Sequence, residues 1–146
     1  MTIETKLAEL GITLPDAPAP AANYVPYVIA GQMLFVSGQI SAAKGRVGAE
    51  LTTAEGAEAA RGCGLSLLAQ AKAALGSLDR VKRVVKLGGF VNSTGDFTEQ
   101  PEVVNGCSDL MVQVFGDKGR HARAAVSAPA LPRGVAVEIE AVFEIE

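Results

Sequence analysis

Apolar and acidic residues alternate near the C-terminus, and this alternation is the clearest pattern in the chain. Apolar residues occupy every second position from Val135 to Phe143, and the acidic residues that point the other way are Glu138, Glu140 and Glu144. A period of two predicts a strand over 135–143, with one face in a core and the other face acidic.

Four further apolar runs predict the remaining strands, over residues 25–29, 33–40, 81–91 and 122–126, and the run 81–91 is the longest. The first two runs are separated by Ala30-Gly31-Gln32, which is typical of a hairpin turn. In the run 81–91, we expect one buried face to comprise Val81, Val85, Leu87 and Val91.

Two longer segments have the three- and four-residue apolar spacing of amphipathic helices. Thr52 and Glu55 form a capping box that opens the first helix, and Gly76 ends it. Pro101 suits the first turn of the second helix, which ends at Gly116. The apolar face of this second helix comprises Val103, Cys107, Leu110, Met111 and Val114.

The element order from residue 23 onward is therefore ββαβαββ. This order predicts an α+β fold, a mixed sheet with two helices packed on one face. The other face would stay uncovered in a single chain and would invite self-association. Residues 1–22 combine a short helix over 3–10 with a stiff, proline-rich connector, so we expect an N-terminal arm (1–22) joined to one domain (23–146).

Composition removes several classes of function. The net charge of −3 makes nucleic acid a poor partner, because nucleic-acid affinity comes largely from phosphate neutralisation. One histidine and two cysteines, Cys63 and Cys107, do not have the spacing of a metal site. The N-terminus has no signal-peptide pattern and no apolar run reaches membrane-span length, so we expect a cytoplasmic protein without membrane contact.

Arg123 is the first candidate for chemistry, because it lies in a strand of Ala and Val. A planar guanidinium binds a carboxylate through two hydrogen bonds, and away from bulk water each contributes roughly 1.5–3 kcal/mol. The carboxylate could belong to a small ligand or to an acid of the protein, and the residue pattern favours neither.

Glu138 is the second candidate. It lies in the middle of the last strand on its acidic face, and a carboxylate inside a subunit interface could hold and activate a water molecule. Glu140 and Glu144 are interpreted as solvated. The single histidine, His121, is interpreted as an ordinary residue at the start of a strand and not as a general base.

Two glycines indicate close approach of another group. Gly106 follows Asn105 inside the second helix, where glycine costs about 1 kcal/mol relative to alanine. Asn105 should point away from the apolar face of that helix. Gly38 lies in Ser37-Gly38-Gln39 at the end of a strand, where backbone groups could meet a ligand.

Taken together, these segments resemble the Rid family, also called YjgF or L-PSP endoribonuclease-like, from about Tyr24 to the C-terminus. The resemblance lies in Arg123-Ala-Ala-Val, then Leu131-Pro132-Arg133-Gly134 and Val137-Glu138-Ile139-Glu140-Ala141, with Met33 to Gln39 matching the second strand. It implies a chorismate-mutase-like fold that forms a homotrimer with a central barrel and ligand pockets between neighbouring subunits.

The resemblance also implies an activity, the hydrolysis of reactive enamines and imines such as 2-aminoacrylate to 2-keto acids and ammonia, with no metal or organic cofactor. Arg123 would bind the substrate carboxylate and Glu138 would position the water. Tyr24 would cover the pocket, Gly38 would offer backbone contact and Asn105 would support the wall. Many members have a cysteine two residues after the arginine, where this chain has Ala125.

The residues leave two other functions open. One is a trimeric, non-catalytic module that binds small carboxylates, because the loops around the arginine differ from those of the best-known deaminases. The other is the endoribonuclease activity in the older family name. The sequence names neither the physiological imine nor its pathway.

Overall fold

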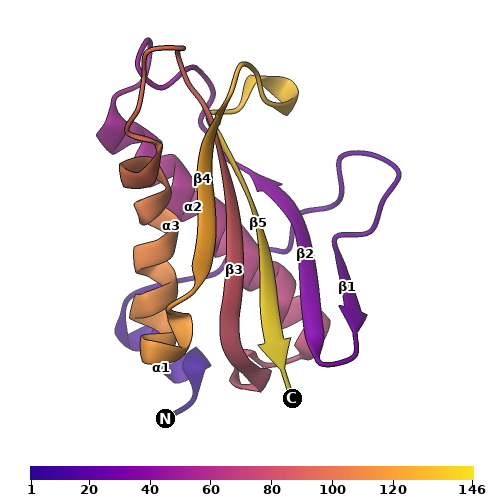
Figure 1. Cartoon of the computed structure of the whole chain (residues 1–146). Coiled ribbons are helices and arrows are strands. Elements are labelled where there is room, and N and C mark those ends of the chain that lie inside the picture. Colours follow the sequence, from indigo (N-terminus) through magenta and orange to yellow (C-terminus); the bar gives the residue numbers. More distant parts are fainter.

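The computed structural model describes residues 1–146 and contains a five-stranded sheet in the order β1-β2-β5-β3-β4 (Figure 1). The strands are β1 (Tyr27–Ala30), β2 (Met33–Ile40), β3 (Val81–Asn92), β4 (Ala122–Ala128) and β5 (Val137–Ile145). The helices are α1 (Ile3–Glu9), α2 (Thr53–Leu75) and α3 (Gln100–Phe115), with 3₁₀ turns η1 (Leu78–Arg80), η2 (Gly116–Gly119) and η3 (Pro132–Gly134). Only β3 and β4 pair in parallel, so the predicted mixed α+β sheet is confirmed.

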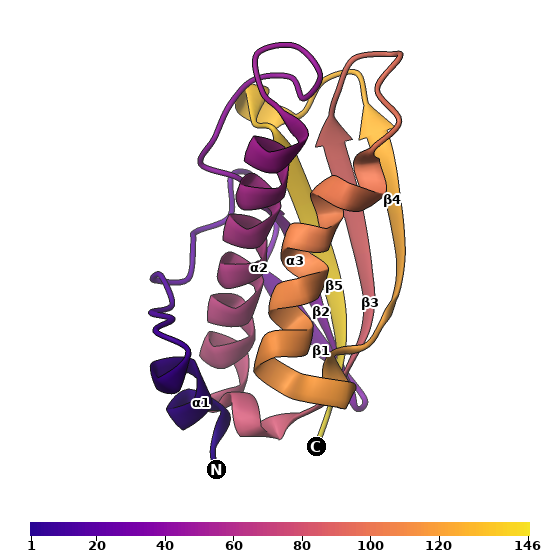
Figure 2. The same ribbon diagram turned by 90° about the vertical axis from the view of Figure 1, so that its left-hand side faces the viewer.

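Both long helices lie side by side over one face of the sheet (Figure 2). The predicted capping box opens α2, with reciprocal hydrogen bonds between Thr52 and Glu55. Gly76 ends α2 in the left-handed conformation that glycine adopts at little cost. Pro101 lies in the first turn of α3, where its missing N–H loses no helical hydrogen bond.

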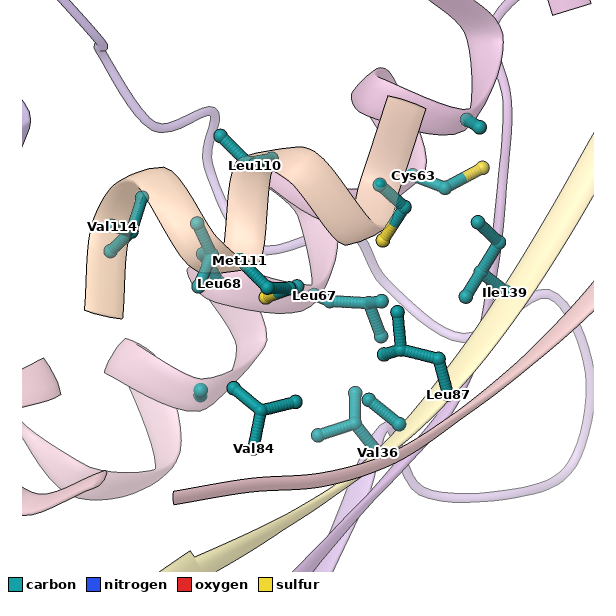
Figure 3. Close-up of a cluster of buried hydrophobic side chains, with 14 of the residues drawn as sticks. Val36, Cys63, Leu67, Leu68, Val84, Leu87, Leu110, Met111, Val114 and Ile139 are labelled. Atoms are coloured by element: carbon teal, nitrogen blue, oxygen red, sulfur yellow. The ribbon is translucent and has the colours of Figure 1, made fainter. Parts of the chain in front are cut away.

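The core lies between the helices and the sheet and consists mainly of aliphatic side chains, with Met111, Phe115, Phe143 and two free thiols (Figure 3). The close approach that the sequence predicts at Gly106 is to the neighbouring helix, because a Cβ there would collide with the carbonyl oxygen of Ala57. A Cβ at Gly64 would similarly press on Leu110 and Cys107. Small residues therefore set the spacing of α2 and α3, which fixes where α3 meets β4.

The pattern prediction for β3 is wrong at one position. Val84 is fully buried, whereas Val85 is only partly buried. The register of β3 against β5 shifts between Val84 and Lys86, and such an irregularity interrupts the alternation of faces. Strand ends also differ by one or two residues from the predicted ones, and the last strand begins at Val137 because η3 precedes it.

The N-terminal arm packs on the rest of the chain. Leu7 is buried, while Leu10, expected on the same stripe, is exposed. The backbone N–H of Ile3 donates to Asp79, and that of Leu78 donates to Glu4. Further along, Gln70 of α2 binds the carbonyl oxygen of Pro18 and so fixes the connector against the domain.

The sheet face opposite the helices is open, as predicted. Exposed apolar side chains there include Val28, Phe35 and Val126, and the acidic side chains of β5 lie among them. No helix in the chain has the length and hydropathy required to cross a bilayer.

Candidate functional site

Arg123 lies on β4 and points toward the helix layer. Its Nη1 donates to Ser108 Oγ (3.0 Å) and its Nη2 donates to the carbonyl oxygen of Pro101 (3.2 Å), and both partners belong to α3. No carboxylate of the chain pairs with Arg123, since the ion pair present joins Arg120 to Asp117. Of the two interpretations that the sequence left open, an ion pair with a protein acid is therefore wrong, and guanidinium donors remain free.

A shallow hollow of about 250 Å³ lies beside this guanidinium. The side chains around it are Asn105, Ser108, Asp109, Val112, Arg120, His121 and Arg123. Asn105 is exposed on α3, away from the buried stripe, as the sequence predicts. The structure thus brings two of the predicted site residues, Arg123 and Asn105, to one polar hollow.

His121 and Ser108 belong to the same hollow, although the sequence analysis set His121 aside and did not identify Ser108. Ser108 Oγ lies 2.9 Å from His121 Nε2, and His121 Nδ1 lies 2.6 Å from the carbonyl oxygen of Gly119. Burial lowers the pKa of His121 and the nearby Arg123 charge lowers it further, against the effect of the Gly119 hydrogen bond. The neutral imidazole is therefore favoured.

Glu138 lies on β5 and points to the open face of the sheet, between Ile40 of β2 and Phe90 of β3. Gly38 leaves the room for its carboxylate, because a Cβ at position 38 would collide with Glu138 Oε2. Burial raises the pKa of Glu138, and the like charge of Glu140 raises it further. A carboxylate with a raised pKa is a stronger base than an ordinary one, which favours proton transfer with water.

Tyr24 and Gly38 share a second, smaller hollow of about 60 Å³. The connector of the N-terminal arm forms part of its wall, from Pro18 to Ala21. The hydroxyl oxygen of Tyr24 accepts a hydrogen bond from the Ala21 N–H (3.2 Å). Beneath it, the buried Gln39 and Gln70 are hydrogen-bonded to each other, and Gln70 also holds Pro18 (2.6 Å).

The predicted site residues thus form two separate groups. We refer to Arg123, Asn105 and Ser108 as the arginine half-site, and to Tyr24, Gly38 and Glu138 as the glutamate half-site. Arg123 is bound to the helix layer, whereas Glu138 projects from the opposite face of the sheet. One chain alone does not bring these two groups together.

The two thiols lie outside both half-sites. Burial raises the pKa of Cys107 to about 12, and burial also raises the pKa of Cys63, so both remain protonated at neutral pH. No group of three or more His, Cys, Asp or Glu side chains in the chain has the arrangement of a metal site.

The mixed sheet with two helices on one face defines a two-layer α+β protein, with an arginine on its edge strand that has no acidic partner in the chain. The chain belongs to the YjgF or Rid family, whose model, described as "YjgF/chorismate mutase-like, putative endoribonuclease", matches residues 4–143. It is 53% identical to Protein TCP17 of Trypanosoma cruzi over 98% of this chain and 94% of that protein. It is also 35% identical to the RutC family protein y4sK of Sinorhizobium fredii, over 92% of this chain and 96% of that one.

Two solved structures show how far the fold is shared. The protein Atu1372 of Agrobacterium tumefaciens, described as of unknown function, is 48% identical and superposes with a TM-score of 0.92 over 99% of this chain and 92% of its own. Escherichia coli TdcF with bound serine is 25% identical, with a TM-score of 0.65 over 89% of this chain and 94% of its own. Because the first match covers nearly the whole chain, its fold includes a counterpart of most of the N-terminal arm.

Proposed function

We propose that the protein hydrolyses reactive enamine and imine intermediates of the 2-aminoacrylate type to 2-keto acids and ammonia. The main observation behind the proposal is the way in which the Arg123 side chain is held. Its side chain is oriented by Ser108 and the Pro101 carbonyl, has no carboxylate partner in the chain, and borders an open hollow. A cation fixed in this way suits the carboxylate that every such substrate carries.

The reaction needs little from the protein beyond orientation and a held water. 2-Aminoacrylate tautomerises to its imine, whose carbon is already electrophilic. The oxygen of a water adds to that carbon, the C–N bond then breaks, and nitrogen leaves with the transferred protons as ammonia. No electrons are exchanged, so fixed charge and proximity suffice for acceleration.

In the proposed active assembly, three copies pack their open sheet faces into a central barrel. The exposed apolar side chains of that face support this arrangement, since contiguous apolar surface favours association. The opposed placement of the half-sites also supports it. A pocket between two copies can combine the arginine half-site of one with the glutamate half-site of its neighbour.

Each predicted residue then has a distinct role. Arg123 binds the substrate carboxylate, and Asn105 forms the adjacent wall. From the second copy, Glu138 holds the water, Gly38 presents its backbone to the ligand and Tyr24 covers the pocket. The similar TdcF structure was solved with serine, a small molecule with the same carboxylate and neighbouring nitrogen, which supports this substrate class.

The test is to generate 2-aminoacrylate in the presence of the protein and to follow the release of pyruvate and ammonia. We expect wild-type protein to accelerate release and Arg123→Ala to remove the acceleration by about a hundredfold or more, because two charged hydrogen bonds are lost. Lys118→Ala is the control, since it removes an exposed cation of η2 that does not line the hollow. An unchanged rate with wild-type protein would refute the activity for this substrate.

The two other functions predict different results. Binding of 2-ketobutyrate without turnover of any imine would instead support a carboxylate-binding module. Cleavage of RNA that disappears in both Arg123→Ala and Glu138→Ala would support an endoribonuclease. The net charge of −3 gives a phosphate backbone little to bind, which is why we rank this function last.

A further inference from the structure

Arg123 and Ser108 of the arginine half-site form one continuous run of hydrogen bonds with the neighbouring His121. Arg123 Nη1 donates to Ser108 Oγ (3.0 Å), Ser108 Oγ lies 2.9 Å from His121 Nε2, and His121 Nδ1 lies 2.6 Å from the carbonyl oxygen of Gly119. The run joins α3 to the start of β4 and to the end of η2. His121 therefore connects to the guanidinium through a single hydroxyl group.

The directions of these hydrogen bonds follow from the chemistry of the groups. A carbonyl oxygen only accepts, so Nδ1 of His121 carries a proton. In the neutral imidazole, Nε2 then has a lone pair and must accept the proton of the Ser108 hydroxyl. Ser108 in turn uses its oxygen to accept from Arg123. While His121 is neutral, the Ser108 hydroxyl proton thus points toward His121.

Protonation of His121 would reverse the middle bond. Nε2 would then carry a proton and donate it to Ser108 Oγ, since a protonated imidazole has no acceptor. The Ser108 hydroxyl proton would be released to another acceptor, and the adjacent hollow is where an acceptor could lie. An incoming carboxylate beside Arg123 would supply such an oxygen.

The charges around His121 oppose its protonation. Cations outnumber anions near it. The cations are Arg120, Arg123 and Arg83, which binds the Arg120 carbonyl, and the anions are Asp109 and the Asp117 carboxylate that pairs with Arg120. In the proposed assembly, Glu138 of a second copy would also lie near the pocket. A bound carboxylate would neutralise Arg123, the cation linked to His121 through Ser108.

We propose that Ser108 and His121 complete the carboxylate site, and that binding of a carboxylate at Arg123 is coupled to uptake of one proton by His121. In the bound state, His121 donates to Ser108, and Ser108 donates to the ligand carboxylate beside the Arg123 guanidinium. By thermodynamic reciprocity, ligand binding raises the proton affinity of His121 by the same factor by which protonation of His121 raises the affinity for the ligand. The inference rests on the proposed function only in assuming that the ligand is a small carboxylate.

The first test uses the single histidine of the chain, whose imidazole signals in NMR spectra need no assignment. In the free protein we expect neutral His121 with its proton on Nδ1. Saturating 2-ketobutyrate should raise the pKa of His121 by about one unit, which corresponds to a tenfold coupling. A proton on Nε2 in the free protein, or a pKa that does not rise with ligand, would overturn the proposal.

The second test measures 2-ketobutyrate affinity by calorimetry from about pH 8 to about pH 5, the range in which histidine titrates. Binding should tighten about tenfold on acidification, and buffers of different ionisation enthalpy should report proton uptake. His121→Gln keeps an acceptor but cannot titrate, so its affinity should be flat over this range. Ser108→Ala should bind about tenfold more weakly without proton uptake, and Ser108→Thr should restore both.

Two further variants separate the outcomes. Glu138→Gln should retain the proton uptake, which would exclude Glu138 as the titrating group. Lys118→Gln removes an exposed charge in η2 and should leave the coupling unchanged. Binding that does not vary with pH would overturn the coupling but leave the hydrolase intact. Proton-coupled binding without turnover of imines would support the coupling and refute the hydrolase, and no binding at all would refute both.

Discussion

The two half-sites are built in opposite ways. Arg123 is held by hydrogen bonds to Ser108 and to the Pro101 carbonyl, and α3, which provides both, is fixed by close packing on α2. Glu138 has no hydrogen-bond partner of this kind and lies on the open sheet face beside Glu140, where burial and like charge raise its pKa. The arginine half-site is complete within one chain, while the glutamate half-site is electrostatically unfavourable alone.

This difference indicates what each half-site lacks in the isolated chain. A desolvated carboxylate next to a second carboxylate gains from a cation, a hydrogen-bond donor or an ordered water brought to it. The oriented guanidinium of Arg123 gains in turn from an incoming carboxylate. A pocket that joins the two half-sites from neighbouring copies would satisfy both requirements, whereas the isolated chain satisfies neither.

The largest effects are expected when the intact arginine half-site and the intact glutamate half-site are placed on different chains. Arg123→Ala and Glu138→Ala should each reduce imine hydrolysis by about a hundredfold or more. If the protein is a trimer with pockets between copies, unfolding and refolding the two variants together should restore about one quarter of wild-type activity. That fraction follows because each pocket then has a one-in-four chance of receiving both intact residues in a symmetric ring.

The control for this experiment is to mix the two variants after each has been refolded alone, which should restore nothing while subunits do not exchange. Sedimentation of each variant would verify that the assembly is intact. Failure to regain activity on joint refolding, with assembly intact, would show that Arg123 and Glu138 act within one chain or not at all.

A smaller effect is expected from Gly38→Ala, which tests the glutamate half-site by displacement. The added Cβ would collide with Glu138 Oε2, the end of a flexible side chain, so the carboxylate should move while the fold remains. A shift of about 1 Å in a catalytic group can cost up to about a hundredfold, and we expect the loss mainly in kcat.

Gly88→Ala is the matched control for this substitution. A Cβ at Gly88 would approach Cγ and Oε2 of Glu140 to 2.9 Å, so the same change presses on the neighbouring acid instead. Activity per folded molecule should fall much less, with Tm monitored for both variants. Equal losses of activity in the two variants would show that the position of the Glu138 carboxylate matters no more to the reaction than that of Glu140.

Much of this architecture could be predicted from the sequence, because the signals were local. The period-two pattern of 135–143 gave the two faces of β5, and an arginine among small apolar residues marked Arg123. The capping box of α2 was also a local signal, and a glycine inside a helical pattern indicated a close approach at position 106, although its partner, Ala57 of α2, is distant in the sequence. Each of these predictions needed only neighbours within one or two turns or strand positions.

The parts that could not be predicted depend on contacts between distant segments. Ser108 and His121 lie 13 positions apart and meet only because α3 packs beside β4. The irregularity that buries Val84 in place of Val85 arises from pairing with β5. The connector forms the wall near Tyr24 because Gln70 binds Pro18, 52 positions away.

The smallest expected effect concerns two acids on β5, Glu138 and Glu140, and tests the electrostatics of the glutamate half-site while Glu138 stays in place. The like charge of Glu140 contributes to the raised pKa of Glu138, so Glu140→Gln should lower that pKa. If the ionised form of Glu138 holds the water, activity falls on the acid side as Glu138 becomes protonated. The acid limb of the kcat/KM profile should therefore move to lower pH, by less than about one unit. Because the shift is read as a difference between variants, the titration of His121 contributes equally to both profiles.

Glu144→Gln is the control on the same strand and face, since it removes an equal charge farther along β5 and should move the profile less. Stability should follow the same sign. A carboxyl whose pKa is raised by folding destabilises the native state above its unfolded-state pKa, so Glu140→Gln should raise Tm at neutral pH, and the gain should vanish once the carboxyls are protonated. An acid limb that stays in place in Glu140→Gln, while Tm rises as expected, would assign the limb to a group other than Glu138. The glutamate half-site would then contribute shape to the pocket and not the base.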